Sequence, residues 1–186
     1  MRVLVACEFS GVVRDAFIRK GHKAWSCDLL PGEGEYSQFH YKQDVLGIIN
    51  DYGFDLMIAH PPCTHLSVSG ARWFKDKKQE QIHALRFVNA LMNAWIPKIC
   101  IENPVSIIST RIRKPDQIIQ PYNFGDPFKK TTCLWLKNLP KLVHTSDMTT
   151  GEQACWKMPP SPDRAKKRSI TYQGIANAMA EQWGTN

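Results

Sequence analysis

The sequence lacks an apolar run long enough to cross a membrane, which takes about 20 consecutive residues. Its first residues, 1–6, form a strand-like run without the charged, apolar and small-residue zones of a signal peptide. Internal repeats and low-complexity tracts are absent as well. We therefore expect a protein that stays inside the cell and does not associate with a membrane.

The sequence also lacks the cysteine and histidine spacings of a metal site or a disulfide framework. Its six cysteines form no Cys-x-x-Cys pair, and its six histidines make no ligand pair at helical spacing. Four of the cysteines lie in or beside apolar runs, as buried thiols do. We expect no metal ion and reduced thiols at Cys7, Cys27, Cys63, Cys100, Cys133 and Cys155.

What is present is an ordinary globular composition, with 43% hydrophobic and 22% charged residues in a chain of 186. This length and composition predict a single domain, 1–186, with a hydrophobic core. Residues from about 138 to 169 are irregular and proline-containing, too short for a domain but long enough for a binding loop. The net charge of +7 suits a polyanionic partner, although many basic domains bind no nucleic acid.

The chain begins with a strand, a turn and a helix, which is the start of an α/β fold. Residues 2–6 predict the strand, 12–20 the helix and 23–28 a second strand. Ser10 can cap the helix, and Gly11 lets the backbone come close to a ligand. A simple strand-to-helix turn is the alternative, because a lone glycine is a weak nucleotide signature.

Carboxylates follow at places where nucleotide cofactors are held. Asp28 ends the second predicted strand, about 20 residues after the turn, where a carboxylate binds ribose hydroxyls. An ordinary loop aspartate is the alternative. Residues 30–42 predict a mobile loop, and Asp44 then opens a short helix as its cap or lies near the adenine edge of a cofactor.

Two later strands end in a proline next to a reactive group. A buried strand at 54–59 precedes Pro61-Pro62-Cys63, and another at 98–101 precedes Glu102-Asn103-Pro104. Neighbouring parallel strands place such ends on one rim of a sheet. Taken singly, the cysteine would be a buried core residue and the glutamate a capping or salt-bridge residue. Together they indicate a site with a thiol and a carboxylate.

The other segments predict packing elements and binding surfaces. Residues 64–72 are small and polar, typical of a loop that closes over substrate. Residues 75–93 predict a helix, and we expect its apolar stripe, which extends to Trp95, to pack in the core. Residues 109–130 mix basic and aromatic side chains as a nucleic-acid surface does, although scattered surface charge is the commoner explanation. A strand at 131–136 and a helix at 172–183 close the chain.

This combination points to nucleophilic catalysis with a nucleotide-like cofactor. A thiolate is a strong nucleophile that can add to an electron-poor ring carbon. A carboxyl group within hydrogen-bonding range can polarise that ring.

Four motifs follow one another along nearly the whole chain: Pro61-Pro62-Cys63, Glu102-Asn103, Gly125-Asp126-Pro127 before a strand, and Gln173-Gly174-Ile175-Ala176-Asn177-Ala178. In this order they resemble the DNA cytosine-5 methyltransferases. The resemblance implies a Rossmann-like, S-adenosylmethionine-dependent methyltransferase fold, a mostly parallel sheet with helices on both faces. It also implies DNA as the partner and the cytoplasm of a bacterial cell or a phage-infected host as the location.

The resemblance implies a role for each matching residue. Cys63 would attack C6 of a cytosine flipped out of its stack, Glu102 would bind or protonate N3, and Asn103 would support the carboxylate. The residues around S-adenosylmethionine would be Phe9, Ser10, Gly11, Asp28, Asp44, Pro61 and Asn177. The residues that contact the substrate would be Thr64, His65, Ser67, Arg72, Lys129, Lys130 and Thr132.

The chain also departs from that family. Its opening turn holds fewer glycines, and Lys130 and Thr132 stand where the family has paired arginines. The transferred group could therefore differ from methyl and come from a modified sulfonium analogue. The family's separate target-recognition domain is reduced to the short segment near 138–169, which predicts low sequence selectivity, a very short site or help from a partner. Such a compact enzyme suits a phage or mobile element, with a monomer as the simpler expectation.

Three alternatives remain open at the level of the sequence. The same thiol chemistry could act at C5 of a free pyrimidine nucleotide or of RNA. The chain could also be a catalytically inactive DNA-binding relative. A cysteine hydrolase that pairs Cys63 with His60 or His65 is the third, and no family resemblance supports it.

Overall fold

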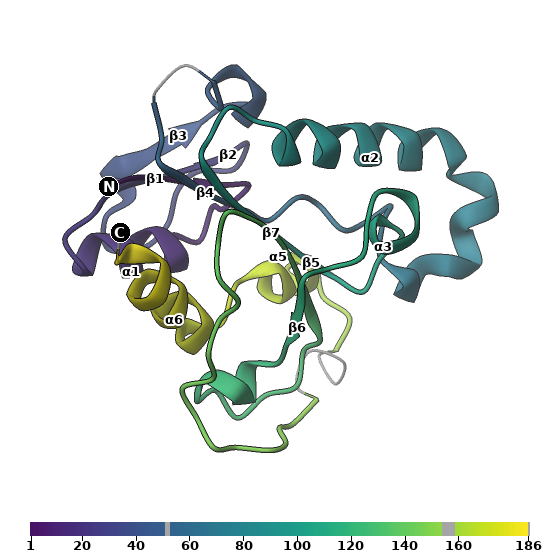
Figure 1. The fold of residues 1–186 in the computed structure, drawn as a ribbon. Helices are drawn as coiled ribbons and strands as arrows, with labels where there is room; N and C mark the ends of the chain where they lie inside the picture. The colour runs from purple at the N-terminus through teal and green to yellow at the C-terminus, as the bar shows by residue number, and fades with distance from the viewer. Residues whose placement is uncertain (51–52, 154–158, 186) are drawn as a thin grey trace.

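A seven-stranded sheet forms the centre of the molecule (Figure 1). The computed structural model describes residues 1–50, 53–153 and 159–185, without the side chains of 72–75. The strands lie in the order β3-β2-β1-β4-β5-β7-β6, and β7 is antiparallel to both of its neighbours. Their bounds are β1 Arg2–Ala6, β2 Lys23–Asp28, β3 His40–Lys42, β4 Leu56–Ala59, β5 Lys98–Pro104, β6 Gln117–Ile119 and β7 Thr132–Lys137.

Helices cover both faces of the sheet, so its central strands are apolar on both sides. All four residues of β4 are fully buried, and so are the four apolar residues of β1. A parallel strand buried on both faces reads as a continuous hydrophobic run, which is why the sequence marks these two strands clearly. The helices are α1 Val12–Arg19, α2 Lys78–Met92, α3 Ile108–Arg111, α5 Arg164–Ser169 and α6 Gln173–Gly184.

The side chains of each strand alternate between two core layers. On one face, α1 and α6 lie side by side and pack on Val3, Val5 and Ile58. On the other face, α2 and α3 pack on Leu4, Met57 and neighbouring residues. The prediction of a mostly parallel α/β sheet with helices on both faces is confirmed, and the arrangement is consistent with a Rossmann-like fold.

Three predicted boundaries are wrong. Residues 30–42, predicted as a loop, contain the 3-10 turn η1 Ser37–Phe39 and the edge strand β3. The loop predicted at 64–72 runs into the 3-10 helix η3 Val68–Asp76. The strand predicted at 98–101 continues to Pro104, because the antiparallel partner β7 extends its pairing to Pro104 and Thr132. Residue Glu102 therefore lies inside a strand and not in a turn.

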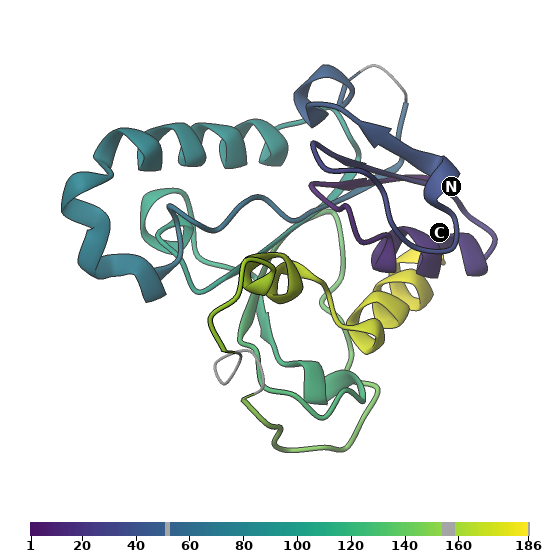
Figure 2. The same ribbon diagram turned by 180° about the vertical axis from the view of Figure 1, so that it is seen from behind.

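Two further corrections concern side-chain exposure and the irregular segment. Trp95 was predicted to pack in the core, but it is 91% exposed because α2 ends at Met92 and the helical periodicity stops there. The segment near 138–169 contains α5, which faces the viewer in Figure 2. Two more 3-10 turns, η2 Val45–Gly47 and η4 Pro121–Phe124, complete the described elements. None of the helices in the described ranges is long and apolar enough to cross a bilayer.

Candidate active site

A cavity of about 870 Å³ opens at the carboxyl ends of the parallel strands β1, β2, β4 and β5. This is the edge at which open α/β sheets bind ligands, because the loops that leave the strands there diverge and leave a crevice. Many of the residues singled out in the sequence line it together: Phe9, Ser10, Asp28, Pro61, Cys63, Thr64, Ser67, Glu102, Asn103 and Lys130.

The turn that carries Cys63 is fixed by hydrogen bonds from both neighbouring strands. Ala59 of β4 pairs with Ala6 of β1 and with Ile101 of β5, so the residues that follow reach the same edge. Asn103 is buried, and its Nδ2 donates to the Pro61 carbonyl oxygen at 2.8 Å. This bond ties the proline turn to β5.

The charges around Cys63 act in opposite directions on its thiol. Cys63 is an exposed residue of the cavity lining. Partial desolvation of its sulfur by the surrounding walls is still the largest effect and raises the pKa of Cys63, and the nearby Glu102 carboxylate raises it further. Lys130 and Arg168 lower the pKa of the thiol but do not cancel the rise. The resting residue is therefore a thiol, which becomes a nucleophile only when it loses its proton.

Glu102 is paired with His60, a contact that the sequence analysis did not predict. The Nδ1 atom of His60 lies 2.9 Å from Oε2 of Glu102, and the two side chains are only 8% and 14% exposed. Burial alone would raise the pKa of Glu102, but the hydrogen bond and charge of His60, together with Lys130 and Thr132, lower it below its ordinary value. The sequence held one signal for this contact. His60 directly follows Ala59 and Glu102 directly follows Ile101, and Ala59 and Ile101 pair between β4 and β5.

Glu8 caps the first helix, a role that the sequence assigned to Ser10. Its Oε1 accepts from the Val13 N–H at 2.7 Å and its Oε2 from the Arg14 N–H at 3.2 Å, whereas Ser10 Oγ accepts from the Val12 N–H at only 3.5 Å. A carboxylate suits the positive end of a helix and satisfies amides that have no partner within it. Glu8 is buried at the wall of the cavity, next to the expected cofactor turn.

Gly11 lies outside the cavity lining, yet the turn needs a glycine there. Its φ of 75° lies in the left-handed region, and a Cβ would meet the Arg14 guanidinium and lie 2.6 Å from the Glu33 carbonyl oxygen. We expect Gly11→Ala to lower the free energy of unfolding by about 1–3 kcal/mol. Urea unfolding measures this, and Gly47→Ala, where a Cβ meets nothing within 4 Å, is the matched control. Equal losses in both variants would contradict the assignment.

Glu8 should make stability depend on pH. Burial raises the pKa of Glu8, and its contacts with His60, Val13 and Arg14 only partly oppose the rise. The folded state therefore holds this proton more tightly, and its stabilising effect is lost as the pH rises through the raised pKa. We expect the stability of the wild type to fall relative to Glu8→Gln in urea unfolding as the pH rises above about 4, the ordinary pKa of a glutamate, and through the raised pKa. A parallel course of the two curves would contradict this expectation.

Glu35→Gln is the control for the Glu8 experiment. Glu35 is exposed, and a side-chain hydrogen bond from Arg19 lowers its pKa. A lowered pKa gives the opposite pH dependence of stability. The stabilising effect is then present when the pH is above the ordinary pKa of a glutamate, and it is lost as the pH falls through the lowered pKa. The wild type should gain slightly over this variant as the pH rises.

Arg14 and α5 hold the loop at 30–36 in place. Arg14 is fully buried and donates to Asp15 Oδ1, Ser26 Oγ and the Glu33 carbonyl oxygen at 2.7, 2.8 and 2.7 Å, which holds the 30–36 loop on α1. From α5, Lys166 reaches Glu33 Oε1 at 2.5 Å and lies over the Phe9 ring. The basic cluster near 164–168 thus closes the cavity, which its position in the sequence did not predict.

The structure places six of the predicted site residues away from the cavity lining. Gly11 shapes the turn, and Asp44 caps η2 by accepting from the Leu46 N–H at 2.9 Å. Thr132 is buried beneath the site, next to Glu102. His65, Lys129 and Asn177 are the others, and Asn177 is exposed on α6 with its side chain bonded to Gln173. The side chain of Arg72 and the whole of Cys155 lie outside the described residues.

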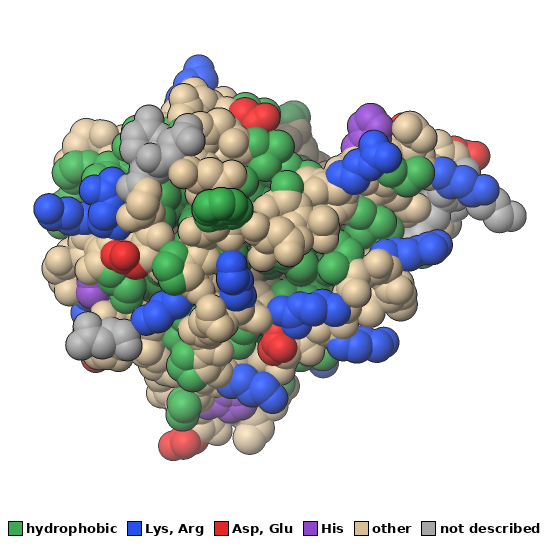
Figure 3. Space-filling view, turned by 45° about the horizontal axis from the view of Figure 1, so that its top comes forward, with side chains coloured by type: hydrophobic (Ala, Val, Ile, Leu, Met, Phe, Trp, Pro, Cys, Tyr) green, Lys and Arg blue, Asp and Glu red, His purple; other side chains and the backbone are tan. Residues whose placement is uncertain are grey.

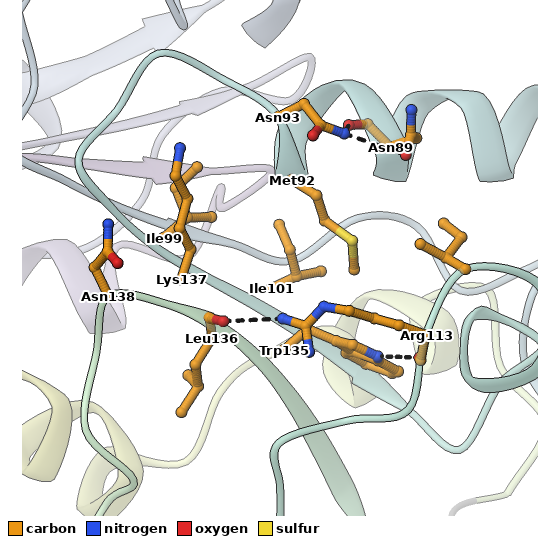
Figure 4. Close-up of a pocket in the computed structure, with 11 residues that line it drawn as sticks. Asn89, Met92, Asn93, Ile99, Ile101, Arg113, Trp135, Leu136, Lys137 and Asn138 are labelled. Atoms are coloured by element: carbon orange, nitrogen blue, oxygen red, sulfur yellow. Dashed lines mark hydrogen bonds between the residues drawn. The ribbon is translucent and has the colours of Figure 1, made fainter.

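A second cavity of about 520 Å³ lies along β5 and β7 beside the end of α2 and shares no lining residue with the first (Figure 4). Ile99, Ile101 and Met92 form its apolar wall, and the Trp135 Nε1–H donates to the Arg113 carbonyl oxygen at 2.8 Å. Among the described residues that line it there is no cysteine or carboxylate, whereas the first cavity holds Cys63 and Glu102. Across the part of the chain that is described, no cluster of three His, Cys, Asp or Glu side chains forms that could hold a metal ion.

Comparison with solved structures finds a likeness to a protein described as "putative DNA modification methyltransferase encoded within prophage Cp-another structure (E.coli)". The two share 16% sequence identity with a TM-score of 0.47, over 87% of this chain and 56% of the other. The chain thus spans a little over half the length of that protein. No family model matches the sequence. No curated protein matches it either.

Proposed function

We propose that this chain transfers a methyl group from S-adenosylmethionine to C5 of cytosine in DNA through a covalent bond between Cys63 and C6 of the base. The observation that supports it is the meeting of Cys63 and Glu102 in one cavity whose other end is lined by Phe9 and Asp28. A thiol and a carboxyl group on adjacent strand ends suit the activation of a pyrimidine ring, and the Phe9 and Asp28 end suits an adenosyl cofactor.

The residues at the cofactor end fit S-adenosylmethionine in chemistry and charge. Asp28 ends β2 and keeps a carboxylate oxygen for ribose hydroxyls, since only Oδ1 is bonded, to the Leu30 N–H at 2.9 Å. Phe9 offers an apolar wall, and the acidic side chain of Asp28 suits a cationic sulfonium. When bound, this cofactor supplies an electrophilic methyl group to C5.

The chain's own residues carry the other steps. Cys63 gives up its proton to solvent water and its sulfur bonds to C6, which pushes the electrons of the C5–C6 double bond towards C5 and the N3 side of the ring. Glu102 holds a proton at N3 so that the ring accepts this charge. After C5 is substituted, loss of the C5 proton and cleavage of the sulfur–carbon bond restore the aromatic ring.

The charge of the surface supports a nucleic-acid substrate. Lys130, Lys166 and Arg168 line the cavity, and the chain carries a net charge of +7. On the face shown in Figure 3, Lys and Arg side chains are widely spread and acidic side chains are fewer. Contacts of this kind neutralise phosphates without regard to sequence. A target cytosine inside a duplex would have to leave its stack to reach Cys63.

The test is a product analysis. The protein is incubated with DNA and S-adenosylmethionine, the DNA is digested to nucleosides, and the cytosine fraction is examined by mass spectrometry. We expect cytosine that carries one added methyl group. Unmodified cytosine from a protein that binds both DNA and the cofactor would overturn the proposal in favour of an inactive DNA-binding relative.

Two parallel reactions address the substrate and the donor. RNA and free cytidine nucleotides replace DNA in the first, and modification of either one in preference to DNA would reassign the substrate. Extracts that contain modified sulfonium analogues replace the pure cofactor in the second, and an added mass other than methyl would reassign the transferred group.

A further inference from the structure

His60 lies between two buried carboxylates, which is an unusual place for a side chain outside the proposed chemistry. Its Nδ1 contacts Glu102 at 2.9 Å, and its charge acts on Glu8, whose side chain lies on the opposite wall. The ring is 8% exposed, and within the described residues its Nε2 atom has no hydrogen-bond partner. A buried polar atom without a hydrogen-bond partner costs free energy, so the presence of a histidine at this position calls for a functional reason.

The contacts of the ring favour one role over another. In a cysteine hydrolase, the imidazole would take the proton of the thiol. Here the ring of His60 contacts Glu102. Asn103 and the Ala6 carbonyl oxygen hold the backbone around it, the latter accepting from the His60 N–H at 2.9 Å. The geometry thus directs His60 to the carboxylate and not to the sulfur.

Holding one oxygen of Glu102 has a chemical consequence. With Oε2 held by Nδ1 of His60 and the carboxyl group also in contact with Thr132, the orientation of Glu102 towards the cavity is fixed from two sides. The carboxyl group helps the addition of the thiolate only when it carries a proton for N3, since an ionised carboxylate faces the N3 lone pair with negative charge. A donor on Oε2 orients the group but also favours its ionised form.

On the basis of the proposed function, we propose that His60 is a positioning residue that fixes Glu102 by one oxygen and sets the pH range in which Glu102 can protonate the pyrimidine. Other charged or titratable groups face the pair from each surrounding element. They are Glu8 after β1, Cys63 after β4, Lys130 before β7 and Arg168 on α5. These groups stay in place when only the imidazole is replaced.

The experiment measures the first half of the reaction alone. Addition of Cys63 to C6 makes C5 exchange its hydrogen with water, so DNA tritiated at C5 of cytosine releases label without any cofactor. The rate of release is followed against pH for wild type, His60→Leu, which removes the donor, and His60→Gln, which keeps an uncharged donor. His83→Leu, on the exposed face of α2, is the matched control.

In wild type, exchange should be lost as the pH rises and Glu102 ionises. In His60→Leu we expect this loss at a pH about one to three units higher, because burial still raises the pKa of Glu102 and the hydrogen bond that opposes the rise is gone. The best rate of this variant should be about ten- to a hundredfold lower, because the carboxyl group is less well oriented. His60→Gln should recover part of the rate, and His83→Leu should match wild type in both respects.

The possible failures can be told apart. An unchanged pH profile and rate in both His60 variants would overturn the positioning role while the exchange itself upheld the proposed function. No exchange by wild type under any condition would instead overturn the proposed function. If His60→Leu fails to give a cooperative thermal transition, His60→Phe takes its place, because its ring fills the same space without a donor, and a wild-type profile and rate there overturn the role.

Discussion

Replacing Cys63 with serine should reduce methyl transfer to DNA by about a thousandfold or more, because the covalent route through C6 is lost. A serine hydroxyl is far more weakly acidic than a thiol and forms no comparable nucleophile in this site. The measurement is the incorporation of labelled methyl groups into DNA, together with release of tritium from C5. Both should fall together, since substitution at C5 depends on the earlier addition at C6.

Binding should survive this change, because the serine occupies almost the same volume at the mouth of the turn. Cys27→Ala is the matched control, since this buried cysteine on β2 is bonded through its thiol only to the Gln43 carbonyl oxygen, at 3.3 Å, and does not line the cavity. Cys27→Ala should retain activity where it folds. Methyl transfer by Cys63→Ser at the wild-type rate would exclude a covalent mechanism through this residue.

The second large effect is expected for Glu102→Gln, which should slow methyl transfer and C5 exchange by about a hundred- to ten-thousandfold. An amide can donate a hydrogen bond to N3, but it cannot transfer a proton to it, so the charge that builds up on the ring is less well stabilised. The Lys130 and Thr132 side chains that favour the carboxylate remain in place. DNA binding, measured by fluorescence anisotropy, should change little.

Glu35→Gln serves as the control, because it removes an equal charge from an exposed side chain that is bonded to Arg19. A thermal unfolding curve of Glu102→Gln shows whether the loss of the His60 contact also affects the fold. If the variant folds and keeps more than about a tenth of the wild-type rate, Glu102 is not the group that protonates the ring.

The parallel centre of the sheet follows from local sequence, and so does the candidate pair. The strand at 2–6 was predicted with the bounds that the structure shows, because a run buried on both faces leaves a continuous apolar signal. The strand at 23–28 was predicted with the right bounds from the alternation of its residues. Cys63 and Glu102 follow two continuous apolar runs, and adjacent parallel strands bring their ends together. Their meeting in one cavity could therefore be expected from sequence, whereas their roles remain proposals.

The edges of the sheet could not be predicted in the same way. β3 and β6 are each three residues long. A strand this short does not show a regular alternation of buried and exposed residues from which it could be recognised in the sequence. The end of β5 depends on its pairing with β7, about thirty residues later in the chain, a spacing across which local propensity carries no information. Long-range pairing therefore decided that Glu102 sits within a strand.

The sequence by itself determined the α/β class, the apolar strands and the positions of the thiol and the carboxylate, because these depend on residue type and short-range periodicity. Only the tertiary structure decided what surrounds those groups. The His60 contact with Glu102, the capping of α1 by Glu8 and the closing of the cavity by α5 each join residues from separate elements. Such contacts depend on packing and register, which no single stretch of sequence contains, and they set the charge and access of the site.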